Sequence, residues 1–107
     1  MFVGILRLVF EIPGARSLKD KRRVVLSFKE RTMNRFRVSV AEVGALDDPR
    51  RAVLGVAVVA NEAAHCDSVL AEVASVAQNL PDALLSDRAT EIVSFGAGGR
   101  GIFGESP

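Results

Sequence analysis

The chain has neither tryptophan nor tyrosine, and its 107 residues include one cysteine and one histidine. Because Cys66 has no partner for an internal disulfide, the sequence favours a reducing, cytoplasmic location. Cys66 and His65 are adjacent, but no further histidine or cysteine is present to complete a zinc site. We therefore expect a cytoplasmic protein with no metal site and no cofactor.

Long hydrophobic runs are also missing. The longest uncharged apolar stretch, residues 52–60, is nine residues long, whereas a membrane helix needs about 20. Arg7 and Glu11 interrupt the apolar N-terminus, which no basic region precedes, so neither a membrane span nor a signal peptide is expected. A hydrophobic content of 49% nevertheless suits a folded protein, and the length fits one domain.

Acidic residues are scarce between Arg16 and Arg37. This segment holds nine of the fourteen Lys and Arg residues but only two acids, which gives it a formal charge of +7. Residues 38–107 carry a charge of −6, so the net charge of +1 hides a polarised chain. Such polarity attracts acidic polymers or surfaces. The candidate nucleic-acid-binding residues are Arg16, Lys19, Lys21, Arg22, Arg23, Lys29, Arg31, Arg35 and Arg37.

Hydrophobic periodicity predicts a single folded domain over residues 1–95. Ser17 is the expected cap of the first helix, with Asp20 at the capping-box position, and Asn61 is the expected cap of the second. Two right-handed crossovers then give an α+β, ferredoxin-like βαββαβ sandwich, with a four-stranded antiparallel sheet and two helices on one face. The strands are expected at 2–12, 36–43, 51–60 and within 88–95, the helices at 18–34 and between 61 and 81, and a flexible Gly-rich tail at 96–107.

Lys21 and Lys29 differ from the other basic residues in their helical position. Both project into the apolar arc of the first helix, beside Leu18, Val25 and Phe28. A charge run usually forms a solvated helix face, and these two lysines can also extend over the edge of the core. The competing hypothesis is phosphate binding, because the helix start adds free backbone amides and a positive dipole end.

No catalytic constellation is evident. Asp47 and Asp48 precede a proline and are typical turn residues, and His65 has no paired nucleophile. Cys66 fits the apolar stripe of the second helix. Residues 96–101 match the G-x-G-x-x-G pattern of dinucleotide sites, but too few residues follow to form the required helix. The prediction is a non-enzymatic protein with no catalytic residues.

The predicted open face of the sheet is apolar and lacks aromatic residues. RNA-recognition domains of the same strand order stack bases on sheet aromatics. The first strand offers Val3, Ile5 and Arg7 on this face instead. An apolar face of this kind favours burial, as in a homodimer. The alternative function is therefore a homodimeric interaction or regulatory module that binds an acidic protein partner.

Residues 12–23, Ile-Pro-Gly-Ala-Arg-Ser-Leu-Lys-Asp-Lys-Arg-Arg, resemble the signature of the YlxP-like family, a bacterial domain of unknown function. Residues 36–43 and 51–61 are similar to its second and third strands, and the likeness extends over residues 1–95. The resemblance implies a ferredoxin-like fold and no recognised catalytic residues. Because members are often encoded among translation and ribosome-maturation genes, it also implies a connection to RNA or the ribosome. Many relatives carry an aromatic residue where this chain has Asp48-Pro49-Arg50.

Overall fold

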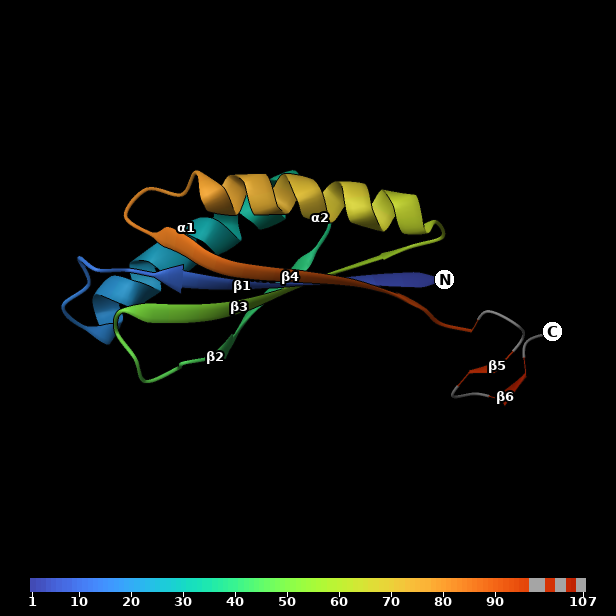
Figure 1. Cartoon of the computed structure of the whole chain (residues 1–107), viewed down its shortest axis with the longest axis horizontal. Helices are drawn as coiled ribbons and strands as arrows, with labels where there is room; N and C mark the ends of the chain where they lie inside the picture. The colour runs from blue at the N-terminus through green and yellow to red at the C-terminus, as the bar shows by residue number, and fades with distance from the viewer. Residues whose placement is uncertain (97–99, 102–103, 106–107) are drawn as a thin grey trace.

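The computed structural model describes residues 1–96, 100–101 and 104–105. Six principal elements follow one another in the order strand, helix, strand, strand, helix, strand (Figure 1). Their bounds are β1 Phe2–Glu11, α1 Leu18–Arg35, β2 Ser39–Gly44, β3 Arg51–Ala60, α2 Ala63–Gln78 and β4 Leu84–Ser94. Two further strands of two residues each, β5 Arg100–Gly101 and β6 Gly104–Glu105, pair with each other.

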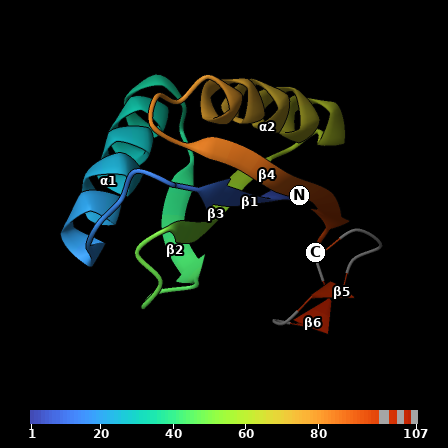
Figure 2. The same cartoon turned by 60° about the vertical axis from the view of Figure 1, so that its left-hand side comes forward.

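The four long strands form one antiparallel sheet in the order β2-β3-β1-β4. Both helices cover the same face of this sheet, and the other face is open (Figures 1 and 2). The predicted α+β, ferredoxin-like sandwich is therefore confirmed, with β1 and β3 in the centre. These are the strands whose inward residues are most apolar, which is why they occupy the positions with neighbours on both sides.

The core lies between the sheet and the two helices. Leu6, Leu8 and Phe10 of β1 are fully buried beneath the helices. The ring of Phe10 meets that of Phe28 from α1 edge to face, with the centroids 5.5 Å apart. Gly4 leaves the space into which α2 packs, since a Cβ there would come within 2.8 Å of Leu70 Cδ1. Close packing therefore fixes both helices on β1.

Three predicted boundaries differ from those observed. β2 begins at Ser39 and not at Phe36. Phe36 is instead the C-cap of α1, and its backbone amide donates a hydrogen bond to the Thr32 carbonyl oxygen. β4 begins earlier than expected, at Leu84, since an irregularity in the register between Val9 and Phe10 lets its first residues continue the pairing with β1. The prediction of Asn61 as a cap was wrong by one residue: Glu62 occupies that position and makes no side-chain cap bond.

The predicted Gly-rich tail and the G-x-G-x-x-G pattern fall largely on residues 97–99, 102–103 and 106–107, which lie outside the described residues. The flexible tail therefore stays a prediction, as does the expectation that the pattern binds no dinucleotide. Within the described ranges, no helix has the length and apolar character needed to cross a membrane.

Candidate nucleic-acid interface on helix α1

Two side chains cap the N-terminus of α1. Ser17 Oγ accepts a hydrogen bond from the Asp20 amide at 3.2 Å, which confirms the predicted N-cap. The Asp20 carboxylate accepts one from the Arg16 amide at 2.8 Å. A carboxylate of the chain itself therefore already lies at the positive end of the helix. An external phosphate is consequently expected to contact basic side chains here rather than free backbone amides.

Lys21 does not reach the surface, although it lies in the middle of the basic run. Its side chain is 1% exposed, and its ammonium group donates hydrogen bonds to three backbone carbonyls of the β2–β3 connection and the start of β3. Those carbonyls belong to Ala45 at 2.9 Å, Leu46 at 3.2 Å and Arg51 at 3.3 Å. Because all three ammonium protons are used, Lys21 is unavailable for phosphate binding, and its inclusion in the candidate interface is corrected.

An ion pair completes the environment of Lys21. Its Nζ lies 2.7 Å from Oε2 of Glu42 on β2, a side chain that is itself mostly buried. The connection that Lys21 contacts includes Ala45, whose φ of 54° is uncommon for a residue other than glycine. Lys21 therefore joins the first turn of α1 to a conformationally constrained loop. Its role is structural.

The other eight candidate residues do reach the surface. Seven are exposed and Lys29 is half-buried. Among the residues that the structure describes, the ion pairs involve Arg7, Lys21 and Arg51, so none of these eight side chains forms an ion pair with a carboxylate. The resulting cationic surface, termed here the α1 surface, consists of Arg16, Lys19, Arg22, Arg23, Lys29, Arg31, Arg35 and Arg37.

The α1 surface is divided between two sides of the helix. At 100° per residue, Arg22 and Lys29 fall on the side away from α2, while Arg31 and Arg35 fall on the side facing it. Leu26 and Met33 lie near Arg22 and Lys29 and are both about half exposed. The nine basic residues therefore do not form the single helix face that the sequence suggested.

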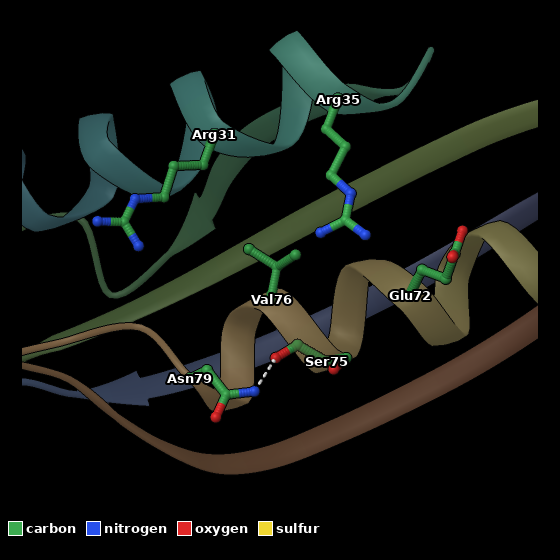
Figure 3. Close-up of a pocket in the computed structure, with 6 residues that line it drawn as sticks. All are labelled: Arg31, Arg35, Glu72, Ser75, Val76 and Asn79. Atoms are coloured by element: carbon green, nitrogen blue, oxygen red, sulfur yellow. Dashed lines mark hydrogen bonds between the residues drawn. The ribbon is translucent and has the colours of Figure 1, made fainter.

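Arg31 and Arg35 line a groove between the two helices (Figure 3). The groove has a volume of about 550 Å³, and α2 contributes Glu72, Ser75 and Asn79 to its opposite wall. Both arginine side chains extend from α1 toward α2. The three α2 residues were not predicted as site residues from the sequence. Their spacing of three and four residues nevertheless indicated that they share one side of a helix.

The remaining candidates for chemistry have structural positions. Cys66 is fully buried, with its Sγ 3.8 Å from the Phe2 carbonyl oxygen, which confirms its packing role. Asp48 Oδ1 accepts a hydrogen bond from the Arg50 amide at 2.9 Å, so it is a turn residue as predicted. His65 is exposed at the start of α2. In the described part of the chain, no three His, Cys, Asp or Glu side chains lie close enough to hold a metal ion.

The open face of the sheet exposes large apolar side chains. Val59 is 63% exposed, Val43 58% and Ile5 43%. Arg7 on the same face pairs with Asp87 at 3.1 Å, so its charge is neutralised. The predicted lack of aromatic residues on this face agrees with the structure, because Phe10 is buried and Phe2 packs against the core.

Comparisons with known proteins find similarity over most of the chain. The uncharacterised protein YlxP of Bacillus subtilis (strain 168) is 32% identical over 71 residues, which is 66% of this chain and 77% of that protein. A solution structure of a de novo designed protein with a ferredoxin fold covers 92% of this chain, and 89% of the designed chain is matched, at 10% identity and a TM-score of 0.48. The model of the family described as "Protein of unknown function (DUF503)" matches residues 3–90. The chain thus belongs to the DUF503 family.

Proposed function

We propose that this protein is a non-enzymatic accessory protein that binds structured RNA, on the ribosome or its precursors, through the α1 surface. One observation carries the proposal: eight cationic side chains reach solvent in or beside one helix, and no carboxylate of the described residues pairs with them. A concentration of exposed positive charge of this kind attracts polyanions electrostatically and speeds their association. Phosphate contacts of this kind supply most of the non-specific affinity for nucleic acids.

The dimensions of α1 and the character of the sheet favour a structured RNA. A helix of 18 residues is about 27 Å long, which is enough to contact several successive phosphates. The open sheet face offers Ile5 and Val59 where RNA-recognition domains present aromatic rings. Binding is therefore expected to depend on phosphate positions and RNA shape rather than on bases stacked on the sheet.

Charge reversal at the start of α1 tests this function. The variant with Lys19→Glu, Arg22→Glu and Arg23→Glu should lose co-sedimentation with ribosomes at low salt. Its far-UV circular dichroism should remain that of the wild type, because all three residues are solvent-exposed and acidic residues are favourable in the first turns of a helix. Arg88→Glu, at an exposed position of β4, is the matched control for the single substitution Arg22→Glu. Both reverse one arginine charge, but only Arg22→Glu should weaken ribosome binding. Unchanged co-sedimentation of the triple variant would refute the proposal.

The absorbance spectrum offers an independent test. Since the chain has no tryptophan or tyrosine, it absorbs almost nothing at 280 nm. Protein purified at low salt should show a peak near 260 nm that nuclease or high salt removes. A preparation without this peak would count against RNA binding in the cell.

The exposed apolar sheet face favours a second candidate function, that of a homodimeric interaction module with an acidic protein partner. Ile5, Val43 and Val59 are exposed and lie on strands β1, β2 and β3, whose other face the helices cover (Figure 2). Burial of such a face between two copies would remove this apolar area from water. Light scattering should then give twice the chain mass, and Ile5→Lys should restore the monomer. A monomeric wild type at micromolar concentration would exclude this candidate.

A further inference from the structure

We propose that the groove between α1 and α2 binds one unpaired guanosine of the RNA, with Arg31 and Arg35 contacting its flanking phosphates and Glu72 its Watson–Crick edge. This inference rests on the proposed RNA-binding function and names the nucleotide that one part of the interface would select. It concerns the side of α1 that faces α2, which the charge-reversal variant at Lys19, Arg22 and Arg23 leaves largely unchanged.

The groove has the volume of a small-ligand site and a polar lining. Its volume of about 550 Å³ falls within the range of about 300–1,000 Å³ that is usual for such sites. Five of its six lining residues are polar or charged, and they come from two helices that the core holds in place. Figure 3 shows the arginines on one wall and Glu72, Ser75 and Asn79 on the other. A ligand would therefore be contacted from both sides.

The arginine wall suits the phosphates on either side of a nucleotide. Arg31 and Arg35 are one helical turn apart, and within the described residues neither forms an ion pair. The guanidinium of Arg35 lies 5.1 Å from the ring centroid of Phe36, a cation–π contact that helps to orient it. Guanidinium groups bind phosphate oxygens through parallel N–H donors. Two arginines one helical turn apart can therefore contact two phosphates of the same RNA strand.

Glu72 argues against a simple phosphate site and in favour of a base. An ionised phosphate group offers a carboxylate no hydrogen-bond donor, whereas the neutral N–H groups of a base donate to it. Among the RNA bases, guanine alone presents two adjacent N–H donors, N1–H and the N2 amino group, on its Watson–Crick edge. An ionised carboxylate can accept both, whereas uracil offers one donor and two carbonyl oxygens.

The rest of the α2 wall can take up further polar groups. Asn79 Nδ2 donates to the Ser75 carbonyl oxygen at 2.9 Å, which fixes the amide and leaves its Oδ1 as an acceptor (Figure 3). The Ser75 side chain is exposed beside it. These groups can bind the ribose hydroxyls or the Hoogsteen edge of the base. The 2′-hydroxyl distinguishes RNA from DNA, and unpaired RNA bases are accessible at their edges.

Stem–loop RNAs with a single variable loop position test the inference. Fluorescence anisotropy would compare guanosine, inosine, adenosine, cytidine and uridine at that position, in one otherwise uridine-rich loop. The wild type should bind the guanosine loop about 10-fold more tightly than the uridine loop, the discrimination expected of one bidentate contact. Inosine, which lacks the N2 amino group, should fall between the two.

Glu72→Gln should reduce this preference to less than about threefold without weakening binding of the uridine loop. Asp67→Asn is the matched control, because it removes the same charge from another exposed position of α2 and should keep the full preference. Equal affinity of the wild type for all five loops, or a guanosine preference that survives Glu72→Gln, would overturn the inference. The wild type could bind all five loops equally while the triple charge-reversal variant binds none of them. In that case RNA binding by α1 stands and only the guanosine site is refuted.

Discussion

Replacing Lys21 by methionine should destabilise the fold severely, although this lysine lies within a run of surface cations. The substitution keeps the side-chain length but removes the partner of Glu42 and the donor for three backbone carbonyls. Removing one member of a buried ion pair costs about 3–5 kcal/mol, because the other charge is left buried and unpaired. Glu42 keeps 21% of its side-chain surface exposed, so water can partly solvate it. The expected loss is therefore about 3 kcal/mol.

Thermal and urea unfolding followed by far-UV circular dichroism measures this loss, since the chain has no tryptophan for fluorescence. For a domain of this size, about 3 kcal/mol corresponds to a melting temperature roughly 12–24 °C lower. Lys19→Met, at an exposed position two residues away, should change the free energy of unfolding by less than about 0.5 kcal/mol. Equal effects of the two substitutions would refute the structural role of Lys21.

A double-mutant cycle isolates the ion pair. Lys21→Met combined with Glu42→Leu removes both charges, and a buried pair replaced by apolar residues is often close to neutral in stability. The double variant should be more stable than Lys21→Met alone, with a coupling energy above about 1 kcal/mol. The three carbonyls would still lack their donor, so recovery should be incomplete. Strictly additive effects would contradict the ion pair.

Four further substitutions test the packing of the helices on the sheet and the cap of α1. Gly4→Ala places a methyl group within 2.8 Å of a side-chain atom of α2 and should cost about 1–3 kcal/mol by urea unfolding, whereas Gly14→Ala, with open space around it, should cost almost nothing. Ser17→Ala removes the cap of α1 and should cost about 1 kcal/mol in the same assay. Phe28→Ala should cost about 3–5 kcal/mol, because its fully buried ring contacts that of Phe10; a loss below about 1 kcal/mol would contradict this packing.

Much of the fold could be predicted from local patterns. The alternating pattern of residues 2–12 and the apolar run at residues 52–60 identify the two central strands. Ser17 and Asp20 mark the start of α1 because their side chains bond amides a few residues away. The start of β4 was less predictable, since its first residues are held by pairing with β1 across a register irregularity. Such a distant partner leaves no local signal.

In the candidate site, too, features with a local sequence signal could be predicted, whereas features that depend on distant residues could not. Surface exposure of Arg22 or Arg31 follows from helical position and charge, and the structure agrees. Lys21 was assigned to the interface because sequence alone does not reveal that the β2–β3 connection folds back over its ammonium group. The groove was missed for the same reason, because its two walls are 37–48 residues apart in the chain and meet only when α1 and α2 pack side by side.

The salt dependence of RNA affinity is the sharpest test of RNA binding through the α1 surface. The slope of log affinity against log potassium chloride concentration falls by roughly one unit for each phosphate contact removed. A triple variant with Lys19→Ala, Arg22→Ala and Arg23→Ala, which removes these charges without reversing them, should therefore lower the slope by about two to three units. The double variant Lys21→Met with Glu42→Leu, which changes only buried groups, should keep the wild-type slope. A triple variant with an unchanged slope, or a double variant with an equally reduced one, would contradict the account.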